Sequence, residues 1–249
     1  MQYKIKINMV RSSNENASTK AFATLVFGDS FRINNIAILE NRENGKLFVS
    51  MPRYRTNEVD EHNNTVFRDV CHPITAECRA ELYDAILAEY ERVRDRIPAD
   101  REKMNEKQDM PEFSVAVTPY EREGSNIRGF ARIYFEDSFV INNVDILQGR
   151  ENLFVSMPSY KTGRKDRDGK DVYQDVCYPI TKEFREKLYG EIERVYAEEK
   201  ERAENAQVQG GQLPDRGNVT EMRTMDAGDE FLKVSGDVIR HIISSRIRQ

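Results

Sequence analysis

The hexapeptide LFVSMP occupies residues 47–52 and recurs without change at residues 153–158. A second block precedes it in both places, because SFRINN at residues 30–35 returns as SFVINN at residues 138–143. Two blocks repeated in the same order indicate an internal duplication, and the rest of the chain is best interpreted from this repeat.

A third block completes the repeat downstream. DVCHPIT at residues 69–75 corresponds to DVCYPIT at residues 175–181. The spacing slips where Gly45 and Lys46 have no counterpart, as expected of a surface turn that tolerates changes in length. A chain of 249 residues is also long enough for two domains of ordinary size. The expected boundaries are a first domain at 1–98, a linker at 99–112 and a second domain at 113–200.

Each copy has the pattern of several strands followed by one helix. Tyr3, Ile5 and Ile7 alternate with polar residues, which is typical of a half-buried strand. Thr75 stands where a helix N-cap is expected, and apolar residues recur after it at helical spacing. In the first copy the expected strands are residues 3–9, 22–27, 31–39, 47–51 and 66–70, with Pro73 preventing extension of the last. The expected buried helix faces are Cys78, Leu82, Ile86, Tyr90 and Val93, and Phe184, Leu188, Ile192 and Val195.

Strands that precede a single helix, without regular alternation of strand and helix, predict the α+β class rather than a doubly wound parallel fold. We expect two tandem domains, each an antiparallel β-sheet with one C-terminal helix and a core of its own. We also expect the two copies to pack as an intramolecular pseudo-dimer, because a sheet edge can pair with its fused twin at high effective concentration.

The C-terminal part of the chain has a different composition. Residues 201–228 contain Gly210, Gly211 and Pro214 with few apolar residues, which predicts a flexible linker. Residues 229–249 then show an amphipathic pattern, which predicts a C-terminal helix. Such a helix on a long tether suits docking to a protein partner or self-association with another copy of the chain. The alternative is a helix that folds back on its own sheets.

Composition and charge favour a cytoplasmic protein whose net charge does not attract nucleic acid or anionic lipid. No stretch has the length of a membrane span, and the N-terminus lacks the apolar core of a secretory signal. Three cysteines over two domains do not make a disulfide framework. The formal net charge of -5 means that any binding of nucleic acid must depend on a local basic patch. We expect no membrane association.

No pattern in the sequence points to an enzyme. The histidines, His62, His72 and His241, are not placed for acid–base work, and phosphate-loop and nucleophile motifs are absent from the sequence. Cys71, His72 and Cys78 do not have the spacing of a metal site, and burial as apolar core residues explains the cysteines better. We therefore expect no catalytic residue, metal, cofactor or small-molecule substrate.

The repeated blocks resemble the stage V sporulation protein G family of bacteria. The resemblance is carried by residues 47–52, Arg55-Thr56, residues 67–69, His72-Pro73-Ile74 and Arg79, and it covers residues 1–95 and 113–199. It implies small sheet-plus-helix domains that dimerise, bind DNA or RNA and regulate septation and sporulation. This chain departs from the usual single-domain form, and the positions of Arg68 and His72 become Gln174 and Tyr178 in its second copy.

Basic residues after the repeated hexapeptide are the candidate nucleic-acid-binding residues. Guanidinium groups suit phosphate, and Tyr54 could stack on an exposed base. The alternative is that these are solvated loop charges, and that the two helix arginines only pair with Asp69 and Asp175. The candidates are Arg53, Tyr54, Arg55, Arg68 and Arg79 in the first copy, and Lys161, Arg164, Lys165 and Arg185 in the second.

Two functions follow from this sequence. The first is a nucleic-acid-binding regulator, with DNA or RNA bound more by the first copy, because aspartates interrupt the basic loop of the second. The second is a non-catalytic interaction scaffold in division or sporulation that does not bind nucleic acid. Salt separates the two functions, since phosphate contacts weaken steeply with salt and apolar docking does not.

Overall fold

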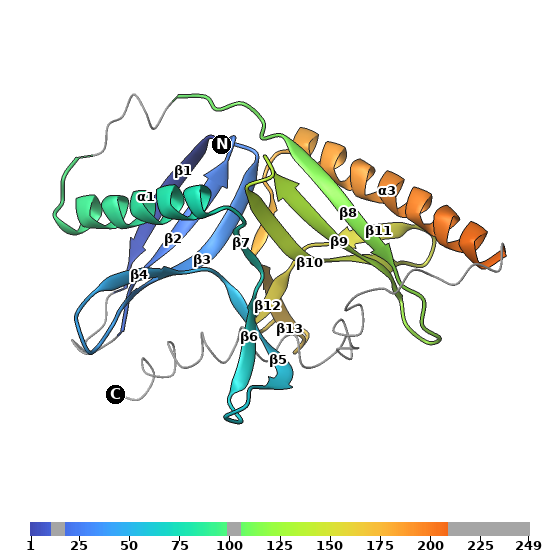
Figure 1. Ribbon diagram of the computed structural model, residues 1–249, viewed down its shortest axis with the longest axis horizontal. Coiled ribbons are helices and arrows are strands. Elements are labelled where there is room, and N and C mark those ends of the chain that lie inside the picture. Colours follow the sequence, from blue (N-terminus) through green and yellow to red (C-terminus); the bar gives the residue numbers. More distant parts are fainter. Residues whose placement is uncertain (11–17, 99–105, 209–249) are drawn as a thin grey trace.

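The computed structural model describes residues 1–10, 18–98 and 106–208, and the two sequence copies form two similar halves (Figure 1). The elements of the first half are β1 (Tyr3–Met9), β2 (Thr19–Phe27), β3 (Phe31–Glu40), β4 (Leu47–Ser50), β5 (Arg53–Val59), β6 (Thr65–Asp69), β7 (Cys71–Pro73) and α1 (Ala76–Arg94). Those of the second half are β8 (Phe113–Pro119), β9 (Ile127–Phe135), β10 (Phe139–Gln148), β11 (Leu153–Ser156), β12 (Ser159–Lys165), β13 (Asp171–Asp175), β14 (Cys177–Pro179) and α3 (Lys182–Val208). The predicted α+β class is confirmed.

Each half contains an antiparallel sheet and a separate two-stranded hairpin. β1, β2, β3 and β4 follow one another in the first sheet, and β8, β9, β10 and β11 do so in the second. The hairpins are β5–β6 and β12–β13. One helix covers one face of each sheet, α1 in the first half and α3 in the second (Figure 1).

The two halves exchange a short strand, which the sequence did not predict. β7 leaves its own half and pairs with β10, while β14 pairs with β3 in the reciprocal arrangement. Pro73 was expected to prevent extension of the strand predicted at residues 66–70, but a further strand, β7, follows β6, and Pro73 is its last residue and pairs with Phe139. A proline is tolerated at a sheet edge, where its missing N–H is not needed by a further strand. The expected pseudo-dimer is confirmed, and strand exchange is its mechanism.

The repeated Asn-Asn dipeptide marks the place where each long strand changes partner. The N–H of Asn34 donates to the carbonyl of Val176, and that of Asn142 donates to Val70, both at 2.8 Å. Asn35 and Asn143 have φ values of 61° and 58°. Asparagine is among the few residues that adopt this left-handed backbone readily, so the dipeptide suits a bulge at this junction.

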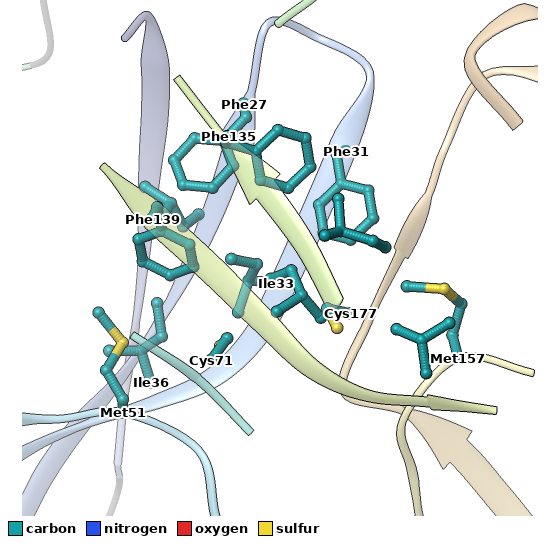
Figure 2. Close-up of a cluster of buried hydrophobic side chains, with 14 of the residues drawn as sticks. Phe27, Phe31, Ile33, Ile36, Met51, Cys71, Phe135, Phe139, Met157 and Cys177 are labelled. Atoms are coloured by element: carbon teal, nitrogen blue, oxygen red, sulfur yellow. The ribbon is translucent and has the colours of Figure 1, made fainter. Parts of the chain in front are cut away.

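One hydrophobic core spans both halves, whereas two separate cores were expected. One contiguous cluster of buried side chains includes residues of both halves, from Ile7 in the first to Tyr196 in the second. Its centre is aromatic (Figure 2): the Phe27 ring lies 5.4 Å from that of Phe135, and the Phe31 ring lies 5.0 Å from the same side chain. The exchanged strands bury Cys71 and Cys177 in this centre. The two halves therefore pack around one shared hydrophobic core.

The helices begin and pack largely as predicted. The Thr75 hydroxyl accepts a hydrogen bond from the N–H of Cys78 at 3.1 Å, which is an N-cap. The expected faces are buried at Leu82, Ile86 and Tyr90, and at Phe184, Leu188 and Ile192. Cys78, Val93 and Val195 are only partly buried, and Tyr196 is buried beyond the predicted face.

Helix α3 runs to Val208, so the boundary expected at residue 200 falls inside it. Alanine and glutamate are good helix formers, and both are frequent in residues 197–206. The amphipathic segment 229–249, and the linker before it from residue 209, lie outside the described residues. Neither α1 nor α3, the helices of the described residues, has the run of apolar residues that a membrane-spanning helix requires.

The second part of the expected linker lies against the first half. The backbone N–H of Gln108 donates to Asp29 at 2.9 Å, and that of Asp109 donates to Gln2 at 3.2 Å. Gly28 has a φ of +49°, and a Cβ atom there would stand 2.0 Å from the Asp109 carbonyl oxygen. Only glycine fits this close approach of two backbone segments.

Candidate nucleic-acid interface

The candidate basic residues lie mainly on the two hairpins, which project from the same side of the molecule (Figure 1). The segment after the first hexapeptide was expected to be a loop, but Arg53–Val59 is the strand β5. The hairpins meet at their bases, where Val70, Tyr160 and Val176 form a small buried cluster with Tyr54 packed against it. This contact fixes the two hairpins beside each other.

The register of the first hairpin decides which side chains share a face. Arg53 lies opposite Asp69 and Arg55 lies opposite Phe67. Residues opposite each other, or two apart in one strand, point to the same side of a hairpin. Arg53, Arg55, Phe67 and Asp69 therefore share one face, which we call the outward face because its two arginines and Phe67 are exposed.

Arginine side chains dominate the outward face of the first hairpin. The Arg53 guanidinium stands 5.7 Å from the centre of the Phe67 ring, a cation–π contact. Neither Arg53 nor Arg55 forms an ion pair with another described residue. Burial raises the pKa of Asp69, whereas the charges of His72, Arg53 and Arg79 lower it. Two guanidiniums are thus available to an anion from solvent.

Arg68 does not join this group, although it was among the candidate binding residues. It lies opposite Tyr54, so its side chain belongs to the other face of the hairpin. There its guanidinium forms an ion pair with Glu58 at 3.1 Å. The parity of the strand, rather than distance along the sequence, separates Arg68 from Arg53 and Arg55.

Tyr54 is half-buried against the cluster at the hairpin base. The aromatic ring that the first hairpin exposes is that of Phe67, which was not among the candidate residues. Tyr173 is exposed at the equivalent position of the second hairpin. The sequence contained a signal for the exposure of Phe67. Side chains of a strand point alternately to its two faces, so Phe67 shares a face with Asp69, two residues later, and not with Arg68 between them.

Lysines of the second hairpin are bound by an acid on the same face. Lys161 forms an ion pair with Asp171, and Lys165 forms one with the same carboxylate at 2.5 Å. Hydrogen bonds from Lys161 and Lys165 lower the pKa of Asp171. Arg164 is exposed, with its backbone N–H donating to the Thr162 hydroxyl. Thr65 occupies the position of Asp171 in the first hairpin, so the first hairpin has no acid at that position.

Arg79 and Arg185, the candidate arginines on the helices, each form a hydrogen bond that stabilises the fold. Nη2 of Arg79 donates to the carbonyl of Pro73 at 3.2 Å, and Nη2 of Arg185 donates to that of Pro179 at 3.3 Å. Each hydrogen bond ties the first turns of a helix to the end of an exchanged strand. Neither arginine forms an ion pair with Asp69 or Asp175 among the described residues, although the Arg185 charge lowers the pKa of Asp175, which burial raises.

Groups that could support other chemistry are scattered. Among the residues that the structure describes, no three His, Cys, Asp or Glu side chains are grouped to hold a metal ion. Burial raises the pKa of the Cys71 and Cys177 thiols and lowers that of His72. Burial also raises the pKa of Asp145 on β10 to about 7, where the first half has Ala37.

Comparison with known proteins identifies the family of both copies and several relatives of the chain. The SpoVG family model matches residues 1–92 and again residues 110–198. The SpoVG protein of Thermoanaerobacter sp. (strain X514) is 36% identical over 93 residues, which are 37% of this chain and 92% of that protein. The SpoVG protein of Alkaliphilus oremlandii is 38% identical over 86 residues, which are 34% of this chain and 84% of that protein.

A further relative is the SpoVG protein of Archaeoglobus fulgidus, which is 31% identical over 84 residues, or 33% of this chain and 92% of that protein. All three relatives carry the name of a septation protein. Each aligns over most of its own length with about a third of this chain, as expected if it corresponds to one copy. No solved structure matches the chain.

Proposed function

Because the chain belongs to the SpoVG family in both of its copies, we propose that it is a non-catalytic regulatory protein that binds DNA or RNA through its hairpins. The regulated process is one of septation or sporulation, in keeping with the name that its relatives carry. The first hairpin contributes more of the affinity than the second.

One observation supports this proposal most strongly. Arg53 and Arg55 share an exposed face and form no ion pair among the described residues, although Asp69 lies opposite Arg53, in a chain whose net charge is -5. An exposed arginine that forms no ion pair is available for bidentate hydrogen bonds to phosphate. A local basic face of this kind is what an acidic protein needs in order to bind a polyanion.

Salt dependence tests the proposal. Fluorescence anisotropy with labelled DNA and RNA, from about 50 to 200 mM salt, should give a linear fall of log affinity against log salt. The Arg53→Ala/Arg55→Ala variant should bind more weakly and reduce the slope by about one for each lost phosphate contact. Arg42→Ala/Arg150→Ala is the matched control, because both arginines are exposed in turns outside the hairpins. No binding of either nucleic acid by the unmodified chain would refute the proposal.

An interaction scaffold is the second candidate, and exposed apolar residues favour it. Phe48 on β4 and Phe154 on β11 occupy equivalent positions and remain about half exposed. Each lies across from a leucine, Leu39 or Leu147, so the surface around it is apolar. Binding of a protein partner there should persist at high salt, and substitution of Phe48 and Phe154 by Ser should abolish it.

A further inference from the structure

We propose that the hairpins take single-stranded nucleic acid and stack its unpaired bases on Phe67 and Tyr173. This inference rests on the proposed function and specifies the kind of nucleic acid that is bound. It starts from two aromatic rings at equivalent positions of the repeat, on β6 and β13, that are 40% and 44% exposed.

Both rings stand among cationic side chains. Phe67 lies directly across from Arg55 and within 5.7 Å of the Arg53 guanidinium. Tyr173 lies directly across from Lys161. Stacking platforms for single strands combine a basic surface that follows the phosphates with aromatic rings that hold the bases. The two hairpins each present both components on one face, although Lys161 of the second hairpin also pairs with Asp171.

Other exposed aromatic residues have different surroundings. Phe48 and Phe154 are 45% and 47% exposed, but their cross-strand neighbours are Leu39 and Leu147 rather than cations. An aromatic ring in an apolar patch suits contact with a protein, whereas a ring beside guanidinium or ammonium groups suits a base next to its phosphate. The chemistry around Phe67 and Tyr173 therefore favours nucleic acid.

Unpaired bases fit these rings better than a duplex does. Bases inside a duplex are already stacked on one another, so their flat faces cannot reach a side chain without being extruded. A two-stranded ribbon can also enter the major groove, where polar side chains read the base edges. Phe67 offers no hydrogen bond for such reading, and its ring is suited to the flat face of a base.

The absence of tryptophan from the chain permits a direct test. Phe67→Trp and Tyr173→Trp each introduce a single indole reporter, and Phe48→Trp provides a control of similar exposure outside the hairpins. Titration with oligothymidylate or oligouridylate should quench the indole at positions 67 and 173 and leave the control unchanged. The same oligonucleotide annealed to its complement should bind more weakly than the single strand.

Leucine variants measure the energetic role of the rings. Phe67→Leu keeps an apolar side chain and should weaken binding of the single strand about 5- to 150-fold, the range that corresponds to the usual stacking contribution of one base. Phe48→Leu should change nothing. Thermal unfolding of both variants checks that the fold is kept, which their exposure favours.

The outcomes separate the two proposals. Binding that is tighter for the duplex, or that is indifferent to Phe67→Leu and Tyr173→Leu, overturns the stacking inference while nucleic-acid binding itself stands. A chain that binds neither the single strand nor the duplex overturns the proposed function, and the stacking inference with it.

Discussion

The two hairpins share a backbone and a common base, yet they present their charges differently. Over residues 53–69 the first hairpin has three basic and four acidic side chains, while the second has five and four over residues 159–175. By this count the second hairpin is the better polyanion binder. The ion pairs favour the opposite expectation, because Asp171 binds Lys161 and Lys165, whereas Arg53 and Arg55 form no ion pair among the described residues, not even with Asp69 opposite Arg53. We therefore expect the position of one carboxylate on the face to matter more for binding than the net charge of the hairpin.

The rest of the molecule is far more symmetric than its hairpins. Each half gives a three-residue strand to the other, and equivalent phenylalanines meet in one core. Duplication thus preserved a common scaffold while the hairpin surfaces diverged. If the asymmetry between the halves is confined to the hairpin surfaces, equivalent changes in the core should have similar effects.

The largest expected effect concerns the shared core. Ile86→Ala and Ile192→Ala remove fully buried side chains at equivalent positions of α1 and α3. Each should lower the free energy of unfolding by about 2 to 5 kcal/mol, and by similar amounts. Chemical denaturation followed by circular dichroism measures both. A single cooperative transition is expected for each variant, because one core spans the halves; loss of only one half's structure would contradict this.

A smaller effect on stability should distinguish the second sheet, which contains Asp145, from the first, which has Ala37 at the equivalent position. Burial raises the pKa of Asp145 from 3.8 to about 7, so between these values the folded state binds a proton that the unfolded state has lost. The free energy of unfolding should therefore fall as pH rises through this window. Asp145→Ala, which copies Ala37 of the first half, should remove the slope and add up to about 4 kcal/mol near pH 8.

Thermal unfolding at about pH 4 and about pH 8 provides the comparison, since at about pH 4 the variant and the unmodified chain should differ little. Ala37→Gly is a control for disturbance of the equivalent strand position, and it should show no such pH dependence. A stability difference between Asp145→Ala and the unmodified chain that is equal at both pH values would argue against a neutral buried carboxyl group.

Removal of hairpin charges should alter binding rather than stability. Changing Arg53, Arg55 and Arg68 together to Ala should lower affinity for DNA or RNA and reduce the salt slope by about two, since Arg68 faces away and is paired with Glu58. The triple Lys161→Ala/Arg164→Ala/Lys165→Ala should do less. Anisotropy titrations at several salt concentrations measure both triples. An equal or larger loss from the second triple would reverse the assignment, and no loss from either would favour the scaffold.

Sequence reasoning identified the elements of the fold more readily than their partners. Periodicity and the Thr75 cap located the helices, because those signals are local. The exchange of β7 and β14 was missed, since three residues are too few for a periodic pattern and their partners lie more than sixty residues away. Pro73 was interpreted as the end of strand pairing. At the end of a strand, however, a proline only removes one backbone N–H donor.

The candidate site was predicted in the correct region but with the wrong grouping. Sequence proximity grouped Arg68 with Arg53 and Arg55, while the register places it on the opposite face. The same register exposes Phe67 and turns Tyr54 toward the hairpin base. Pairing between strands sets these faces, so composition alone could not reveal them.

A reciprocal exchange of one residue tests whether the carboxylate at the position shared by Asp171 and Thr65 determines which hairpin binds nucleic acid more strongly. Thr65→Asp should weaken nucleic-acid binding by the first hairpin, and Asp171→Thr should strengthen binding by releasing Lys161 and Lys165. Asn63→Asp and Asp168→Asn make the same changes of net charge in the turns and serve as matched controls.

Affinities of the four variants for one labelled DNA and one labelled RNA at fixed salt give the answer. We expect each exchange variant to shift affinity well beyond its matched control, downward for Thr65→Asp and upward for Asp171→Thr. Shifts that equal those of Asn63→Asp and Asp168→Asn would mean that only net charge matters, and would contradict this expectation.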